Sequence, residues 1–159
     1  MIVEFAIIGP VMMLMTIGIL EFILAFTSYI RLNEAMRSAT REAFLQPTVA
    51  DIDSLETTDA ICQKLEEEDL ACGSYAVNDE DAFDAIVAKA RATYPGLTEN
   101  NIIVTYSPSG IGTSSTSDGT VPLVSVEVTD YTYEFITGDF MPISSIEFPA
   151  FKTSRMRPY

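Results

Sequence analysis

The side chains that could perform chemistry are carboxylates, two cysteines and a few lysines. The chain has no histidine, so it lacks the commonest general base near neutral pH and the commonest transition-metal ligand. Ser-His-Asp catalysis, Cys-His catalysis and histidine-bearing zinc sites are therefore excluded. Lys64, Lys89 and Lys152 have no serine at a spacing that suggests a hydrolase. We expect a protein that is not an enzyme and that uses no cofactor.

Two acidic groups have the oxygen ligands that Ca²⁺ prefers. One is Asp51, Asp53 and Glu56, and the other is the run Asp-Glu-Asp at 79–81. Neither has the glycine and acid spacing of an EF-hand loop. We interpret both groups as solvated acidic surface and expect no metal site.

Cys62 and Cys72 are the only cysteines and lie ten residues apart in the polar part of the chain. In a short chain, such a pair suggests a disulfide formed in an oxidising compartment. A metal site is disfavoured because there is no second cysteine pair and no histidine. The bridge would close a small loop and contribute ~2–3 kcal/mol in the chain-entropy model.

Charge and apolar character are distributed unevenly along the chain. The net charge is −14, and residues 51–99 alone carry thirteen acids against three bases. Such a chain would be repelled by nucleic acid, whose binding requires many cations. The sequence thus indicates an apolar N-terminal segment joined to an acidic soluble head.

Residues 1–26 form a nearly uncharged apolar run in which only Glu4 and Glu21 carry charged side chains. The run has the length of about 20 residues that a spanning helix needs. It is too long for a signal peptide and has no basic residue before it. A helix that is apolar on all sides would otherwise need a large surrounding core, which this chain is too small to supply. We therefore predict a membrane helix.

Three residues of this helix stand out. Glu4 is costly to bury and should have a partner. That partner would be a free terminal amino group, or the side chain would extend to the lipid headgroups. Glu21, near the other end, can reach the membrane interface more easily. Pro10 predicts a kink or a loosened turn. This turn is either an ordinary feature of a membrane helix or one that lets the helix stretch in a polymer.

The helix is expected to continue through residues 27–46 in amphipathic form. Its apolar stripe contains Leu32, Ala35, Met36, Ala39 and Ala43. Pro47 should end it, because the residue before a proline leaves the α region. The chain then divides into an N-terminal helix, 1–46, and a soluble head, 47–159.

The head is predicted to be α+β, with about three antiparallel strands packed on the long helix. Hydrophobic spacing and breakers predict helices over 59–70 and 82–94 and strands over 101–107, 122–137 and 148–156. A change of alternation within 122–137 predicts a β-bulge near Thr129 and Asp130, or a bend into two strands. Residues 108–120 are rich in Gly, Ser and Thr and predict a long hairpin loop.

Arg31, Arg37 and Arg41 favour a cytoplasmic head by the positive-inside rule. The cysteine pair favours an oxidising compartment instead. The conflict disappears if a basic leader once preceded Met1 and was removed.

An ordered set of short motifs gives the N-terminus a family resemblance. These motifs are Val-Glu-Phe-Ala at 3–6, Pro10, Gly-Ile-Leu-Glu-Phe at 18–22, Asn-Glu-Ala at 33–35 and Ala-Thr-Arg-Glu-Ala at 39–43. Together they resemble the N-terminal signature of TadE-like minor pilins of the tight-adherence (Tad, or Flp) type IV pilus system. The shared motifs cover about the first 45 residues. The head resembles heads of this family only in its general character.

The resemblance implies a type IV pilin-like fold and specific residue roles. Glu4 would be the assembly glutamate and Phe5 the residue that follows it, with Pro10 and Glu21 in the same assembly helix. A prepilin peptidase would remove a leader on the cytoplasmic face. The glutamate usually lies fifth after the cut, whereas here it is fourth from Met1. Either one mature residue is absent from the sequence or Met1 is an added start.

Several functions remain open from the sequence. The first is a minor pilin, a single-pass inner-membrane protein with a periplasmic head that reaches the cell surface after assembly. Its partners would be the lipid bilayer, other pilins and an inner-membrane assembly platform. The second is an adhesive subunit that displays the loop 108–120 at a filament tip. The third is a pseudopilin of a type II-like secretion system, which would be anchored and assembled by the same interactions of its N-terminal helix but with different partners.

Overall fold

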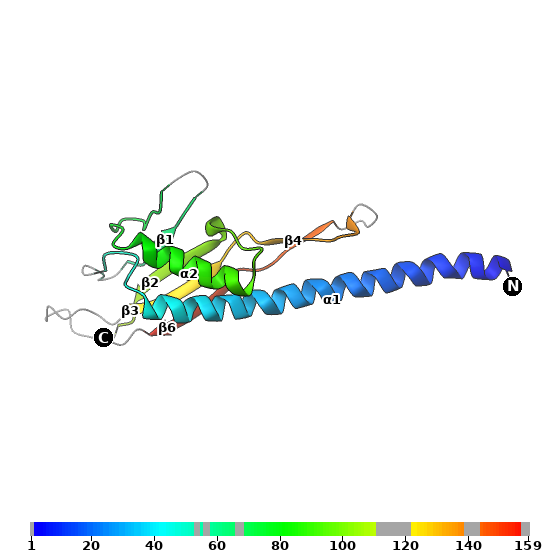
Figure 1. Cartoon of the computed structure of the whole chain (residues 1–159), viewed down its shortest axis with the longest axis horizontal. Coiled ribbons are helices and arrows are strands. Elements are labelled where there is room, and N and C mark those ends of the chain that lie inside the picture. Colours follow the sequence, from blue (N-terminus) through cyan, green and yellow to red (C-terminus); the bar gives the residue numbers. More distant parts are fainter. Residues whose placement is uncertain are drawn as a thin grey trace. The chain divides into compact units, whose positions relative to one another are not determined.

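The computed structural model describes residues 2–52, 55, 58–65, 69–110, 122–138 and 144–156, with side chains from Phe5 onward. They form two compact units: residues 1–30 with 132–148, and residues 31–131 with 149–159. Helix α1 (Ile2–Leu45) contributes residues to both and is one continuous helix through Pro10 (Figure 1). A long apolar helix, a small antiparallel sheet and a short helix confirm the predicted α+β class.

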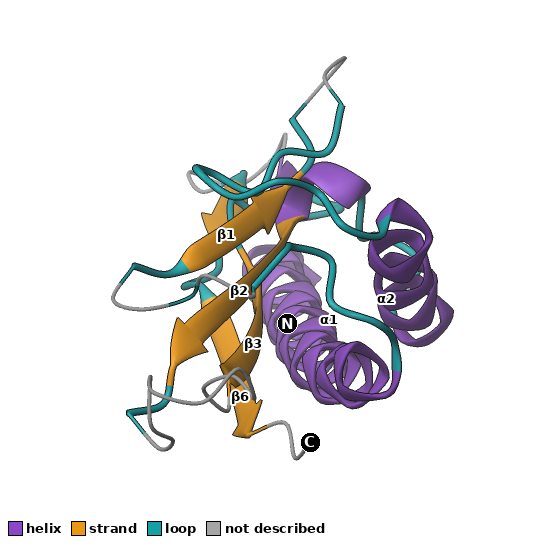
Figure 2. Cartoon of the chain, turned by 90° about the vertical axis from the view of Figure 1, so that its left-hand side faces the viewer, coloured by secondary structure: helices purple, strands orange, loops and turns teal. Residues whose placement is uncertain are grey.

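The second unit is built on a four-stranded antiparallel sheet in the order β1-β2-β3-β6. The strands are Ala60–Gln63, Ile102–Pro108, Pro122–Val128 and Phe151–Met156. Helix α1 and helix α2 (Glu80–Thr93) lie against the same face of the sheet (Figure 2). In β2 and β3 the apolar side chains at alternating positions are buried: Ile102, Val104, Tyr106, Val124, Val126 and Val128. Their period of two places them on one face of the sheet. Thr105 and Ser125, which lie between them in the strands, are buried as well.

The part of α1 in the second unit buries the predicted apolar stripe. Leu32, Ala35, Met36, Ala39 and Ala43 are all fully buried. Three of the five are alanines, and small side chains let a helix backbone approach a neighbouring layer closely. The helix ends at Leu45, two residues before Pro47, as the proline predicts.

Helix α2 follows the sequence pattern closely. The Asp79 side chain accepts a hydrogen bond from the Ala82 backbone N–H at 3.1 Å and caps the helix N-terminus. The buried face is Ala82, Phe83, Ile86, Val87 and Ala90, which has the three- and four-residue spacing of an amphipathic helix. A short 3₁₀ helix, η1 (Glu99–Asn101), then leads into β2.

The predicted helix over 59–70 is wrong, because the segment forms strand β1. Ala60 and Cys62 are buried whereas Ile61 is exposed, which is a period of two. Cys62 pairs with Val104 of β2. The helical prediction relies on the spacing of Ile61, Cys62 and Leu65 in the sequence, and two of these, Ile61 and Leu65, are exposed. Pairing with a distant strand overrides the local helical pattern here.

The predicted strand over 122–137 divides in two, which confirms the bend rather than the bulge. Strand β3 ends at Val128, and Asp130 takes a φ of 55° in the turn that follows. Strand β4 (Thr132–Glu134) then pairs with β5 (Ser145–Glu147) in a separate two-stranded sheet. The expected last strand, 148–156, is shorter and begins at Phe151. The head thus has four strands in its main sheet, not three.

The predicted loop 108–120 joins β2 to β3, whose last and first residues, Pro108 and Pro122, are paired. Residues 111–121 lie outside the described part of the chain.

Candidate assembly segment

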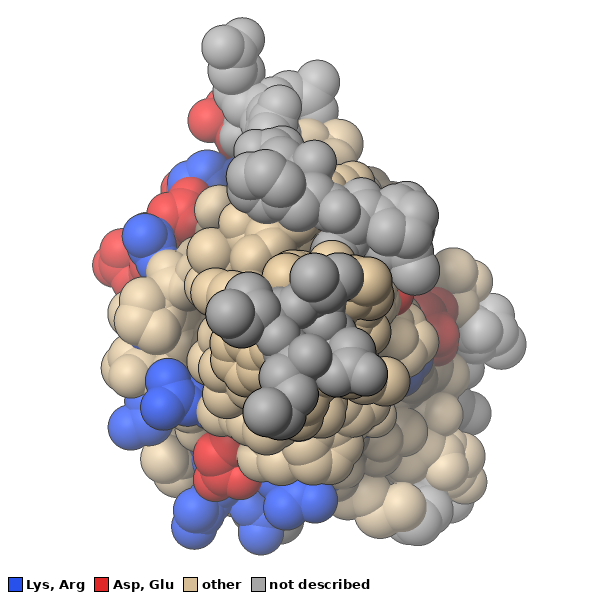
Figure 3. Space-filling model, turned by 90° about the vertical axis from the view of Figure 1, so that its right-hand side faces the viewer, with Lys and Arg blue, Asp and Glu red and all other residues tan. Residues whose placement is uncertain are grey.

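The first unit presents an apolar helix surface that the rest of that unit leaves largely uncovered. Phe5 is 78% exposed, and the apolar side chains that follow are exposed on nearly every face. Figure 3 shows uncharged side chains on the described residues at this end of α1. The helix is long and apolar enough to cross a membrane.

Hydroxyl groups within this apolar segment are satisfied by the helix itself. Thr16 Oγ1 donates to the Met12 carbonyl oxygen, and Thr27 Oγ1 donates to the Ile23 carbonyl oxygen, each at 2.8 Å. Such bonds remove the cost of placing a hydroxyl group in an apolar environment. These two threonines can therefore sit in lipid without a partner.

Among the described side chains of this segment, Glu21 is a buried carboxylate with 4% of its surface exposed. Its Oε1 accepts hydrogen bonds from the Thr137 backbone N–H at 2.8 Å and the Thr137 hydroxyl at 3.0 Å. Its Oε2 accepts a longer bond from the Ile136 backbone N–H at 3.4 Å. We call this arrangement of Glu21, Ile136 and Thr137 the Glu21 site. It joins the hairpin of β4 and β5 to α1 within the first unit.

Aromatic rings extend from α1 into the same hairpin. Tyr29 meets Phe148 edge-on at 5.8 Å between ring centroids, and Phe148 stacks on Tyr133 at 6.2 Å. Phe26 stacks on Tyr29, and Phe135 meets Tyr133 edge-on. We call these five rings the aromatic cluster. It provides a second attachment between helix and hairpin, independent of Glu21.

The predicted site residues differ in what the structure says of them. Pro10 lies inside the continuous helix, and Phe5 is exposed on it. The side chain of Glu4 lies outside the described residues. Sequence reasoning placed Glu21 near the interface but did not find its partners, Ile136 and Thr137. They lie 115 and 116 residues further along the chain, where spacing gives no signal.

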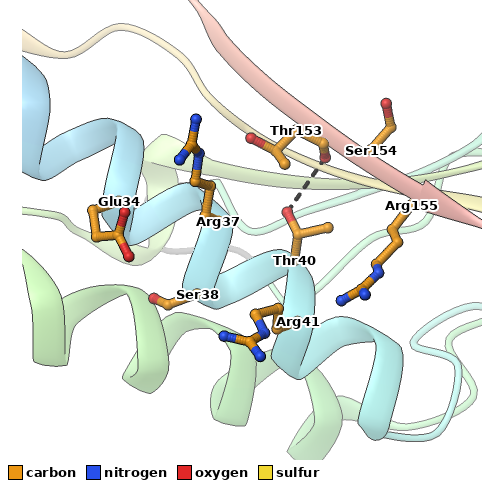
Figure 4. A pocket seen from close by; sticks show the side chains of 8 residues that line it. All are labelled: Glu34, Arg37, Ser38, Thr40, Arg41, Thr153, Ser154 and Arg155. Carbon is orange, nitrogen blue, oxygen red and sulfur yellow. Dashed lines mark hydrogen bonds between the residues drawn. The ribbon is translucent and has the colours of Figure 1, made fainter.

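A basic hollow occurs on the second unit, in contrast to the acidic balance of the whole chain. It has a volume of about 390 Å³ between α1 and β6 (Figure 4). Its lining is Glu34, Arg37, Ser38, Thr40, Arg41, Thr153, Ser154 and Arg155. Thr40 Oγ1 donates a hydrogen bond to the Met36 carbonyl oxygen at 2.8 Å. The same oxygen atom lies 3.3 Å from the Thr153 carbonyl oxygen. Arg37, Arg41 and Arg155 are exposed, and the Arg155 guanidinium lies 5.3 Å from the centroid of the Phe44 ring.

The predicted Cys62–Cys72 disulfide is present, and both cysteines are buried. It joins β1 to the segment that leads to α2. Near the end of β1, Lys64 forms ion pairs with Glu99 at 3.3 Å and Glu80 at 3.9 Å. The hydrogen bond to Glu99, together with the charge of Glu99, raises the pKa of the Lys64 ammonium above its ordinary value.

The acidic groups considered for Ca²⁺ are divided by the structure. Asp79 caps α2, and Glu80 pairs with Lys64. Asp53 and Glu56 lie outside the described residues, whereas Asp51 is described. Among the described residues, no three His, Cys, Asp or Glu side chains lie close enough together to hold a metal ion.

The N-terminal segment matches a known family. The family model of TadE-like proteins matches residues 1–41. This match confirms the resemblance predicted from the sequence, over the same stretch of α1. Neither a curated protein nor a solved structure matches the chain significantly. TadE-like proteins are a structural rather than a catalytic family. The TadE-like segment and the apolar helix together indicate a membrane-anchored protein associated with a Tad pilus.

Proposed function

We propose that the chain is a minor pilin of a Tad-type pilus. Helix α1 anchors it in the inner membrane with the head in the periplasm, and the same helix then carries it into the filament or initiates the filament. Its partners are the bilayer before assembly, other pilin subunits afterwards, and the prepilin peptidase and inner-membrane assembly platform in between. As part of the filament it supports attachment to surfaces.

The observation that carries this proposal is the exposed apolar surface of α1. Sixteen large apolar or aromatic side chains between Phe5 and Ile30 are exposed. Burying one such side chain completely is worth ~1.5–3 kcal/mol, so covering all of them would contribute on the order of tens of kcal/mol. That gross energy exceeds the ~5–15 kcal/mol net stability of a typical domain. A surface of this kind needs lipid or neighbouring subunits to cover it.

The two halves of α1 have side chains suited to different surroundings. Residues 5–26 carry large apolar side chains all round the helix, which fits lipid or a filament core. From Leu32 to Ala43, the apolar side chains form one buried stripe against the head. We infer that the first half polymerises while the second half holds the folded head on the stem.

Glu4 is proposed as the residue that aligns one subunit with the next. A carboxylate in an apolar helix is costly to bury and should have a partner. The free amino terminus of a neighbouring subunit would provide one. Pro10 frees the carbonyl group four residues before it, which would allow local stretching of the helix in the filament.

The test replaces Glu4 with Ala or Leu and measures both membrane content and pilus production. We expect the variant to remain in the membrane fraction while pilus production falls sharply. The matched control is Glu42→Ala, which removes a carboxylate from the same helix. Glu42 lies outside the apolar half, and its carboxylate accepts a hydrogen bond from Gln46. Normal pilus production by the Glu4 variants would refute the proposed role of Glu4. Recovery of the wild-type chain from the soluble fraction would refute membrane anchoring.

A further inference from the structure

The geometry points to the hairpin of β4 and β5 as a second membrane-contacting element that lies in the lipid–water interface beside α1. The inference rests on the proposed function, because it requires α1 to span the bilayer. It assigns to residues 132–138 and 144–148 a ligand of stated chemistry, namely the interfacial layer of a phospholipid bilayer.

The first argument is the level at which the hairpin meets the helix. Thr137 donates two hydrogen bonds to Glu21. Glu21 lies five residues before Phe26, where the apolar run ends. At 1.5 Å per residue, this places Thr137 about 7.5 Å inside the end of the apolar segment, measured along the helix axis. A helix that spans the bilayer would therefore carry the hairpin to the membrane surface.

The second argument is what the hairpin exposes at that level. Ile136, beside Thr137, is 79% exposed and is the most exposed of the large apolar side chains in the described residues. Ile146 of β5 and Phe22 of α1 are also exposed. Water would disfavour this arrangement of apolar side chains, whereas the acyl-chain boundary favours it.

The third argument is the aromatic cluster. Tyrosine and tryptophan rings concentrate at membrane–water interfaces, where an apolar body meets a polar edge. Two of the five rings, Tyr29 and Tyr133, carry a hydroxyl group that suits the headgroup layer. The cluster begins at Phe26, the end of the apolar run, and continues into the hairpin as far as Phe148.

Charge sets the depth of the hairpin. Glu134 and Glu147 lie in the two strands and are exposed. A hydrocarbon core disfavours charged side chains strongly, so the hairpin is placed in the interfacial layer. The Ile136 side is then directed toward the acyl chains, and the ends of β4 and β5 nearest Thr132 and Glu147 lie in water.

The Glu21 site explains how an open hairpin can approach lipid. An unpaired backbone N–H is costly where water is scarce. The backbone N–H groups of Ile136 and Thr137 donate to Glu21, and the carboxylate that a membrane helix would otherwise leave unpaired accepts them. Each group satisfies the polar requirement of the other.

The chain contains no tryptophan, so single tryptophans can report lipid contact without background. We choose Phe22→Trp on α1, Ile136→Trp on the hairpin and Ile61→Trp on β1, all at exposed positions. The full chain is reconstituted in phosphatidylcholine vesicles with and without brominated acyl chains, at one chain per vesicle. Tryptophan emission is then compared between the two kinds of vesicle.

We expect bromine to reduce the emission of F22W and of I136W and to leave that of I61W unchanged. Adding Glu21→Ala to I136W should weaken its quenching, because the hairpin loses its hydrogen-bonded attachment. Quenching of F22W without quenching of I136W would overturn the inference and leave the proposed membrane anchor standing. Failure to quench F22W would contradict the anchor itself. Equal quenching of I61W and I136W would show that the whole head contacts lipid, which also overturns a specific role for the hairpin.

Discussion

Replacing Thr137 with Val should loosen the hairpin of β4 and β5 from α1. Valine keeps the shape of threonine but removes the hydroxyl group that donates to Glu21 at 3.0 Å. A hydrogen bond to a charged group contributes ~1.5–3 kcal/mol. Because 1.4 kcal/mol is a tenfold change in an equilibrium constant, local opening should become about 10- to 140-fold more frequent.

Amide hydrogen exchange measures this opening directly. The backbone N–H of Thr137 is itself bonded to Glu21 at 2.8 Å, so its exchange rate follows the opening of the Glu21 site. The measurement uses the full chain in detergent micelles. Thr137→Ser retains a hydroxyl group and should exchange like the wild type. Thr27→Val removes a hydroxyl group that donates to its own helix and should leave Thr137 unaffected.

A double-mutant cycle isolates the interaction between the two side chains. Glu21→Ala should accelerate exchange more than T137V, because it leaves two backbone N–H groups without their acceptor. In the absence of Glu21, adding T137V should have little further effect. Unchanged exchange in T137V, or full additivity of the two substitutions, would refute the conclusion that the Glu21 site holds the hairpin.

Three further substitutions test the second unit by denaturant unfolding of the full chain in detergent. Replacing Cys62 and Cys72 together with Ala should lower the free energy of unfolding by ~2.7 kcal/mol, the chain-entropy value for this loop; an unchanged midpoint would contradict this. Asp79→Ala should cost ~1 kcal/mol through loss of the α2 cap, whereas Asp79→Asn should cost less. Ala39→Leu should cost ~1–3 kcal/mol, because Ala39 is fully buried and leucine would overpack the site. The exposed Glu34→Leu on the same helix is its control.

The sequence predicts α1 well because its signals are local. Length and apolar content define the first half, and the stripe from Leu32 to Ala43 defines the second. A proline marks the end. Helix α2 is predictable for the same reason, since Asp79 and the apolar spacing lie within one segment. In both helices the bonds that define the element join residues four apart.

The sequence gives a wrong prediction for strand β1 because the structure of this strand depends on distant residues. Its four residues pair with β2, some forty positions further along the chain. Local spacing at Ile61 and Leu65 favoured a helix, and neither side chain is buried. The alternation of Ala60 and Cys62 was present in the sequence. It is too short to outweigh the apparent helical period.

The Glu21 site shows a different limit. The sequence identifies Glu21 as a charge within an apolar helix and therefore as a group in need of stabilisation. It does not identify Ile136 and Thr137, because two of the three bonds come from backbone N–H groups, which every residue except proline carries. Of the three donors to Glu21, only the Thr137 hydroxyl belongs to a side chain and so depends on the residue type. Only the path of the chain through β3, the turn at Asp130 and β4 brings these donors to the helix.

The internal satisfaction of polar groups gives the apolar half of α1 a physical property that suits an assembly stem. The hydroxyl groups of Thr16 and Thr27 donate to their own helix, and Glu21 accepts from the hairpin of the same unit. None of these three groups requires water or a second subunit. The proposed function moves α1 from the bilayer into a filament, and the internal hydrogen bonds of Thr16, Thr27 and Glu21 can be kept in both places. The transfer free energy then depends on how well side chains such as Phe5 and Phe22 pack against neighbouring helices rather than against lipid, which is the general condition for helix association in membranes.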